Sequence, residues 1–247
     1  MNASRDAALA PDSCTPDVET SSANYASRFA GSSGRYLLDV QADAIRKVLK
    51  GLPPGTALDV GGGHGQLVDL LQEAGWKTTV HGTDGECERN LRELHAKRDV
   101  PFLKGDLFSL PVADRSFDLV IAVRLISHVD AWQRLVAEMC RVARKSVVID
   151  YPSTSGFNAL TPLLFRMKRS MEGNTRTYTS FSRAELRTEF RRHGFTRSTE
   201  RKQFFMPMVV HRMGRGNALL RGAEAIFRGV GLTALAGSPV ILRVDRP

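Results

Sequence analysis

Apolar and polar positions follow two different periods along this chain, and the two periods alternate. Residues 34–52, GRYLLDVQADAIRKVLKGL, place apolar side chains at helical spacing, whereas the next segment, TALDV, is a short apolar run typical of a buried strand. The alternation then recurs, with strands predicted at 77–84, 100–106, 116–125 and 145–152 and helices at 65–76, 85–98 and 129–143. Strand and helix repeated five times predict a parallel sheet with helices on both faces.

The remainder of the chain is less regular. A helix is expected around 160–171, and a second over 182–195, where Ser182 is a plausible N-cap and Glu185 follows it at capping-box spacing. Residues 195–209 are interpreted as a strand, 217–231 as a basic amphipathic helix and 237–244 as a closing strand. Because the sequence shows no repeat and no separate linker, residues 23–247 are predicted to form one domain. Within it, residues 153–180 and 207–232 are interpreted as additions that border the substrate or cover the sheet.

Composition fits a globular protein with a sizeable core, since 42% of the 247 residues are hydrophobic. Residues 1–22 lack large apolar side chains and the hydrophobic stretch of a secretory signal, which indicates a disordered leader. No apolar run approaches the length that a membrane span needs. The three cysteines, an odd number without metal-type spacing, suit a reducing compartment. We therefore expect a soluble, cytoplasmic protein without a metal site.

The net charge of +9 is unevenly distributed. Residues 151–247 hold 17 Lys and Arg against 6 Asp and Glu, a surplus of +11, which leaves −2 for residues 1–150. Such asymmetry favours an acidic partner, namely a phosphate or carboxylate on a substrate, an anionic membrane surface or nucleic acid. A merely solvated basic exterior is the alternative. Nucleic acid is the less favoured reading, because no RNA-binding appendage or aromatic stacking motif accompanies the arginines.

The stretch ALDVGGGHGQ runs from a predicted strand into a glycine-rich turn, a pattern that requires something to approach the backbone closely. Its spacing is D-x-G-x-G-x-G, formed by Asp59, Gly61, Gly63 and Gly65. The dinucleotide pattern G-x-G-x-x-G fails because Gln66 stands at its third glycine position, and no Gly-Lys-Ser or Gly-Lys-Thr follows to make a P-loop. The turn therefore does not predict a phosphate site.

This stretch resembles motif I of the class I S-adenosylmethionine (SAM)-dependent methyltransferases. The resemblance implies that the glycine turn lies beneath the methionine part of the cofactor and that Asp59 fixes its amino acid end. It also implies a Rossmann-like, doubly wound α/β sheet of seven strands, mostly parallel with an antiparallel last strand. The physical reading agrees, since a zwitterionic methionine moiety beside a sulfonium needs close backbone approach and a nearby carboxylate.

Two further acids follow in the order that the family uses. Asp84, in VHGTDGE, matches the acid that accepts hydrogen bonds from the ribose hydroxyls, although it can also be a simple turn residue. The segment KGDLFSLPVADRSFDLVIA is similar to the adenine-binding stretch, which places Asp106 at the adenine amino group and the Leu107 amide at the ring. Val123, near the end of the next predicted strand, completes the predicted cofactor site.

The segment VRLISHVDAWQRLVAEMCRV resembles a small-molecule branch of the family that includes quinone-biosynthesis and natural-product methyltransferases, so a role in secondary metabolism is expected. Histidine is a residue type suited to general-base catalysis, which makes His128 a candidate base, but its position also suits helix capping or packing. Methyl transfer depends largely on positioning and desolvation, so a catalytic base is not required.

Predicted acceptor-binding residues lie in the less generic parts of the chain, and each has surface exposure or packing as its alternative. They are Tyr25, Arg28, Tyr36, Arg124, Asn158, Arg176 and Tyr178. The predicted function is methyl transfer from SAM, most simply to oxygen of a small or lipophilic metabolite. Two alternatives stay open: an RNA or protein methyltransferase that docks through the basic C-terminal region, and a non-catalytic relative that binds the cofactor. The basic helix near the C-terminus either rests on an anionic membrane or covers the sheet.

Overall fold

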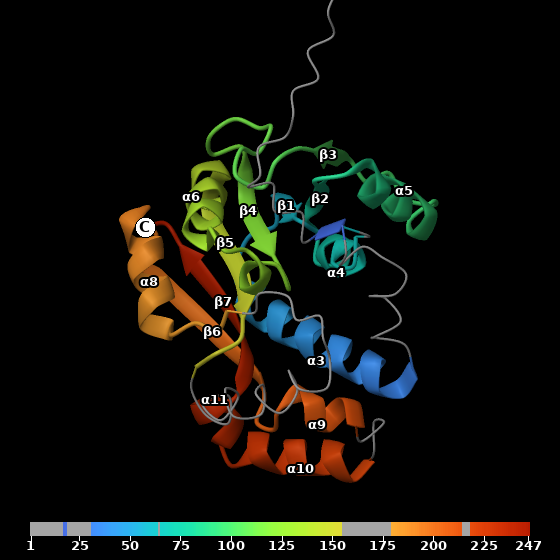
Figure 1. Ribbon diagram of the computed structural model, residues 1–247, viewed down its shortest axis with the longest axis vertical. Helices are drawn as coiled ribbons and strands as arrows, with labels where there is room; N and C mark the ends of the chain where they lie inside the picture. Colours follow the sequence, from blue (N-terminus) through green and yellow to red (C-terminus); the bar gives the residue numbers. More distant parts are fainter. Residues whose placement is uncertain (1–16, 19–30, 64, 155–178, 214–217) are drawn as a thin grey trace, which may run out of the picture.

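The computed structural model describes residues 17–18, 31–63, 65–154, 179–213 and 218–247 (Figure 1). Seven strands form one sheet in the order β3-β2-β1-β4-β5-β7-β6. Their bounds are β1 Thr56–Val60, β2 Lys77–Gly82, β3 Phe102–Lys104, β4 Phe117–Ala122, β5 Ala143–Tyr151, β6 Arg197–Phe204 and β7 Ser238–Asp245. The first five pair in parallel, and β7 runs antiparallel to both β5 and β6. The predicted fold class, with its antiparallel last strand, is confirmed.

Helices cover both faces of this sheet (Figure 1). The helices of the described residues are α3 Gly31–Leu49, α4 Val68–Glu73, α5 Gly85–Leu94, the 3₁₀ helix η1 Ile126–His128, α6 Trp132–Val142, α8 Arg183–Arg192, α9 Met208–Met213, α10 Ala218–Gly229 and α11 Leu232–Ala236, of which α9 and α10 lie at one end of the molecule (Figure 1). Neighbouring residues of β4 point to opposite layers: Val120 belongs to the core beneath α6 and α8, whereas Leu119 and Ile121 belong to the core beneath α3 and α4. The continuous apolar strands of the sequence are explained by burial on both faces.

The carboxyl ends of the strands form one edge of the sheet, and this edge positions the candidate site. In the register, Asp59 of β1 lies opposite Ile121 of β4, and Gly82 of β2 lies opposite Lys104 of β3. Since β6 is antiparallel to β7 and β7 is antiparallel to β5, β6 runs parallel to β5 and ends at the same edge. Residues 205–237, which contain α9, α10 and α11, therefore connect β6 to β7 at the same edge of the sheet as the glycine turn.

Two predicted elements are corrected. Residues 195–209 were expected to form one strand, but β6 ends at Phe204 and α9 begins at Met208, directly after Pro207, whose fixed φ suits a helix start. The helix expected over 65–76 is confined to 68–73, because Gly65 adopts a left-handed φ of +74° that no helix contains. The Ser182 cap is confirmed, since its hydroxyl accepts a 3.1 Å hydrogen bond from the Glu185 amide. The helix predicted over 160–171 lies outside the described residues.

Part of the expected leader contacts the domain. Asp17 is fully buried and accepts hydrogen bonds from the Thr83 amide, at 2.6 Å, and from the Thr83 hydroxyl, at 2.7 Å. This contact lies just beyond the carboxyl end of β2, next to the segment that carries Asp84.

Within the described residues, no helix is long and apolar enough to cross a membrane. The same part of the chain contains no group of three or more His, Cys, Asp or Glu side chains that could hold a metal ion. Cys87 and Cys140 are buried free thiols there.

Candidate active site

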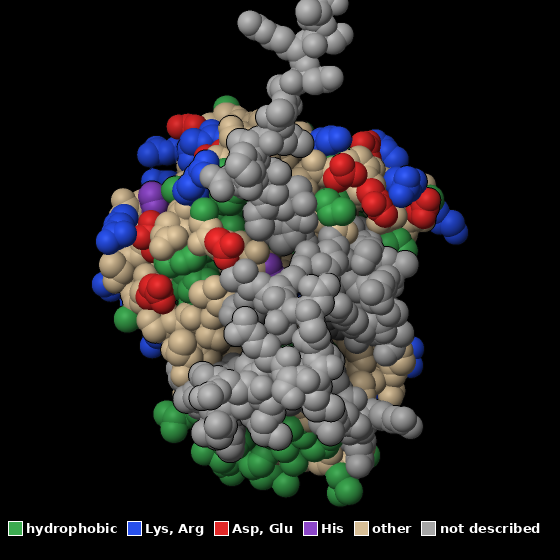
Figure 2. Space-filling view, viewed as in Figure 1, with side chains coloured by type: hydrophobic (Ala, Val, Ile, Leu, Met, Phe, Trp, Pro, Cys, Tyr) green, Lys and Arg blue, Asp and Glu red, His purple; other side chains and the backbone are tan. Residues whose placement is uncertain are grey.

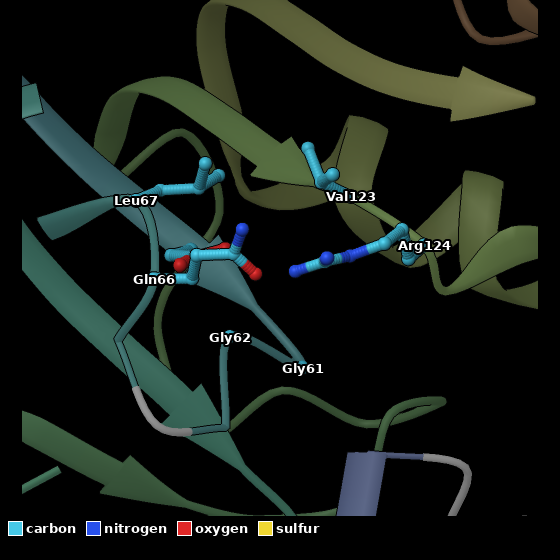
Figure 3. Close-up of a pocket in the computed structure, with 7 residues that line it drawn as sticks. Gly61, Gly62, Gln66, Leu67, Val123 and Arg124 are labelled. Carbon is cyan, nitrogen blue, oxygen red and sulfur yellow. The ribbon is translucent and has the colours of Figure 1, made fainter. Parts of the chain in front are cut away.

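A pocket opens where β1 and β4 end (Figure 3). Its lining residues are Asp59, Gly61, Gly62, Gln66, Leu67, Val123 and Arg124. In Figure 3 the Gln66 side chain, from the turn after β1, and the Arg124 side chain, from the segment after β4, point toward one another across the pocket. Asp59, Gly61, Val123 and Arg124 were predicted for the site. Gly62, Gln66 and Leu67 were missed, because spacing alone does not tell which turn residues face the opening.

Glycine is required in the turn for two separate reasons. Gly61 and Gly65 have φ values of +65° and +74°, which other residues seldom adopt. At Gly62 the limit is space, because a Cβ there would lie 2.3 Å from Asp59 Oδ2. The turn is held by hydrogen bonds from the Gly62 amide to the His81 carbonyl, 3.1 Å, and from the Gly65 amide to the Gly62 carbonyl, 2.9 Å. The pocket floor is therefore bare backbone beside a carboxylate.

Asp59 is the chemically unusual group of the pocket. Asp59 is only 2% exposed, and its Oδ2 has no hydrogen-bond partner among the described residues. Burial raises the pKa of Asp59 to about 7, although the nearby Arg124 guanidinium lowers it. A buried carboxylate without a partner is costly unless a cationic group joins it. The pocket is therefore suited to a ligand that brings a positive charge to Asp59.

Arg124 is held in the pocket wall by its own backbone. It has a left-handed φ of +59°, and its amide donates a hydrogen bond to Asp150 Oδ1 at the end of β5. Gln41 Nε2 of α3 donates to the other oxygen of Asp150 at 3.4 Å. Burial raises the pKa of Asp150 to about 6 against the lowering effect of the Arg124 amide. Asp150 was not predicted as a site residue, although an acid inside the apolar run KSVVIDYP was a usable signal.

The two acids predicted to hold the adenosine lie at adjacent strand ends. Asp84 and Asp106 each stand two residues beyond the paired residues Gly82 and Lys104. Asp84 caps α5 by accepting from the Glu86 amide at 2.8 Å, and Asp106 accepts from the Phe108 amide at 2.9 Å. Because an ionised carboxylate has about four acceptor positions, this local bonding is compatible with a second, ligand-binding role. Leu107 is fully buried in the core.

The remaining predicted residues lie elsewhere or outside the described part. His128 ends η1, is half-buried and does not line the pocket. Tyr36 of α3 packs 5.9 Å from Phe204 and 6.0 Å from His211, measured between ring centroids, with the Arg221 guanidinium 4.8 Å above its ring. Their roles in catalysis and acceptor binding stay predictions. Outside the described residues lie Tyr25, Arg28, Asn158, Arg176 and Tyr178.

The residues present fit an adenosyl amino acid better than a dinucleotide. Asp59 offers an unpartnered buried oxygen for an ammonium group, and the turn has Gln66 where a dinucleotide-binding turn needs its third glycine. Asp84 and Asp106 offer acceptors for hydroxyl and amino groups at the next two strand ends.

Comparison with known proteins agrees with this geometry. Residues 58–149 match the family model described as a methyltransferase domain. A malonyl-[acyl-carrier protein] O-methyltransferase of Methylococcus capsulatus is 27% identical over 198 residues, which cover 76% of this chain and 70% of that protein.

Two solved structures share the fold. A SAM-dependent methyltransferase from Thermotoga maritima superposes with a TM-score of 0.62 at 19% identity, covering 91% of this chain and 95% of that one. Magnesium protoporphyrin IX methyltransferase from Synechocystis, solved with bound SAH, superposes with a TM-score of 0.60 at 15% identity, covering 93% and 98%.

The sheet, the glycine turn and these matches define an enzyme that uses SAM as its methyl donor. More narrowly, residues 58–149 match a methyltransferase domain, and the chain has the fold of the class I SAM-dependent methyltransferases.

Proposed function

We propose that the enzyme methylates an oxygen atom of a small or lipophilic acceptor, and that the acceptor carries a negative charge. The observation that carries the proposal is the presence of Arg124 in the pocket wall that also contains Asp59. Arg124 is permanently charged, so it favours an anionic oxygen, such as a carboxylate, on the acceptor. The name of the Methylococcus relative, an O-methyltransferase, supports oxygen as the accepting atom.

In this proposal each part of the strand edge has a separate task. The bound cofactor supplies an electrophilic methyl group on a sulfonium. Asp59 holds the ammonium end, while Asp84, Asp106, the Leu107 amide and Val123 hold the adenosine. Arg124 orients the accepting oxygen. Apolar side chains in and beside the pocket, including Leu67 and the buried Leu125 under the turn, limit the access of water.

An anionic acceptor makes a general base unnecessary. A carboxylate is already ionised at neutral pH, so transfer depends on alignment of the oxygen with the methyl group. If the acceptor is instead a neutral hydroxyl, His128 is the candidate base. The two cases differ in a His128→Gln variant, which keeps full turnover from about pH 6 to about pH 9 when no base is used. A loss of turnover in the variant near neutral pH, where an unprotonated histidine can accept a proton, would assign that role to His128.

Incubation of the purified chain with methyl-labelled SAM and a fractionated cell extract tests the proposal. We expect label in a small or lipid-soluble product that is released by mild alkali, because alkali cleaves methyl esters but not methylated nitrogen or carbon. An Asp59→Asn variant, impaired in holding the cofactor, is the background control. Label recovered in RNA or protein would contradict the proposal and support macromolecular methylation through the basic C-terminal region. Alkali-stable label in a small molecule would contradict the choice of an anionic acceptor.

A further inference from the structure

Helix α10 exposes a stripe of apolar residues. Its exposed apolar positions recur at spacings of three and four residues and form one stripe: Ala218, Leu219, Gly222, Ala225, Ile226 and Gly229. The stripe continues past the helix end to Val230 and onto Leu235 of α11. Leu219, Ile226, Val230 and Leu235 are 80%, 65%, 66% and 75% exposed, and we call these four residues the α10–α11 face. Figure 2 shows hydrophobic side chains gathered at the end of the molecule where Figure 1 places α10.

The inward side of α10 carries the buried Glu224 and also Phe227, which packs 4.6 Å from Phe205 between ring centroids, and these contacts fix the orientation of the helix. Glu224 is fully buried, and its carboxylate accepts hydrogen bonds from the Phe205 amide, 3.0 Å, and the Met206 amide, 2.8 Å. His211 Nε2 of α9 lies 3.0 Å from the same carboxylate. Because breaking a buried polar cluster of this kind is costly, α10 cannot rotate cheaply to bury its apolar stripe. The outward stripe is therefore a fixed property of the fold.

The charge around the face has one sign. Residues 205–237 contain four arginines and one acid, Glu224, which is buried, so the exposed charge of this segment is positive. Arg221 donates to the Ser32 carbonyl at 2.9 Å and Arg228 to the Gln203 carbonyl at 3.4 Å. Among the described residues, neither arginine forms an ion pair with a carboxylate. Arg228 is exposed and can therefore meet an anionic partner without first losing an acidic one, whereas Arg221 is half-buried with its guanidinium over the Tyr36 ring.

From these observations we propose that the α10–α11 face docks on the surface of an anionic lipid bilayer. An aliphatic stripe flanked by arginines has the composition of a helix that lies in the membrane interface. A second copy of the chain fits less well, because pairing two such faces would bring arginines together with no exposed acid in the segment to neutralise them. A folded acidic protein could form ion pairs with the arginines, but it would also need a groove that is complementary to the four exposed aliphatic side chains.

The docked face lies at the edge of the sheet where the pocket opens, because residues 205–237 join β6 and β7 at the carboxyl ends of the strands. An acceptor dissolved in the bilayer would then be close to the site that receives it. This last step rests on the proposed function, whereas docking itself does not.

Flotation of the full chain with vesicles tests docking without any need for a substrate. One set contains phosphatidylcholine alone, and the other contains phosphatidylcholine with about one third phosphatidylglycerol. We expect binding to the mixed vesicles that is at least about tenfold stronger than to the neutral ones and that weakens as salt is raised. Equal or absent binding to the two sets would overturn the proposal.

Substitution of two exposed aliphatic residues assigns the binding to the face. The double variant Leu219→Gln with Ile226→Gln should lower partition into the mixed vesicles by at least about tenfold. Leu94→Gln on α5 is the matched control, since Leu94 is 64% exposed but lies on a different helix, and it should bind like the original chain. Binding by the double variant equal to that of the control would contradict the assignment. A concentration-dependent dimer that the double variant abolishes, with no vesicle binding, would show instead that a second copy covers this face.

Discussion

The protonation of Asp59 should control cofactor affinity near neutral pH. Its carboxylate is buried, its Oδ2 has no partner among the described residues and its pKa is raised to about 7. Only the charged form can hold the ammonium end of the cofactor, so binding must release the proton that Asp59 carries at lower pH. At about pH 6 close to nine tenths of the free protein is protonated there, and the dissociation constant should rise about eightfold over its value at about pH 7.5, or about 1.3 kcal/mol.

Isothermal titration calorimetry with S-adenosylhomocysteine measures this without turnover. Titrations at about pH 6 in buffers of different ionisation enthalpy should report release of about 0.9 proton per ligand bound, falling toward zero above about pH 8. Asp59→Asn should bind more weakly at every pH and lose this release. Asp150→Asn tests whether the proton comes from the other buried acid with a raised pKa: this variant should keep the proton release, even if the lost contact with the Arg124 amide changes the affinity. An affinity that is independent of pH, or an unchanged proton release in Asp59→Asn, would refute the reasoning.

Three further outcomes follow from single contacts. Gly62→Ala should reduce cofactor affinity at least about tenfold, since its Cβ would meet the Asp59 carboxylate at 2.3 Å, whereas Gly222→Ala, with open space around it, should bind normally in the same calorimetric assay. Arg124→Gln should raise the KM for an anionic acceptor. Because Arg124 lowers the pKa of Asp59, the affinity for S-adenosylhomocysteine is compared at about pH 9, where Asp59 is ionised, and should be unchanged there. A loss confined to that affinity would move Arg124 to the cofactor's carboxylate. For Asp118, burial alone would raise the pKa, but the Thr56 amide and the Lys145 ammonium outweigh it and hold the pKa at about 2. The ionised Asp118 therefore contributes to the free energy of unfolding above about pH 4, and this contribution is lost as the pH falls toward 2. Urea unfolding should find Asp118→Asn about 2 kcal/mol less stable than the original chain at neutral pH and equally stable at about pH 2. A difference that does not change with pH would exclude this linkage.

The central part of the fold was predictable because its signals are local. TALDV is a strand with the predicted bounds, and the run of buried strands and amphipathic helices around it follows from apolar spacing alone. The end of β6 was misjudged because Phe205 and Met206 continue an apolar run, and their amides turn instead to Glu224, 19 and 18 residues away. Pattern reading within a short window does not see such a partner.

The candidate site was likewise predictable from the sequence only in part. The acids and glycines at strand ends could be chosen from motif spacing, whereas Gly62 and Asp150 owe their importance to contacts that spacing does not encode. Gly62 is constrained by a side chain three residues earlier, and Asp150 meets Arg124 only because β4 and β5 are neighbours in the sheet. The outward apolar stripe of α10 was visible in the sequence as an amphipathic helix. Which side of that helix faces the protein was settled by the buried Glu224.

A crystal structure of the full chain with S-adenosylhomocysteine tests the central claim most directly. The account predicts the ligand's ammonium group against Asp59 Oδ2, its ribose hydroxyls at Asp84 and its adenine amino group at Asp106, with the amino acid part over Gly61 and Gly62. Adenosine bound away from the ends of β2 and β3, or an ammonium group that leaves Asp59 without a partner, would contradict it.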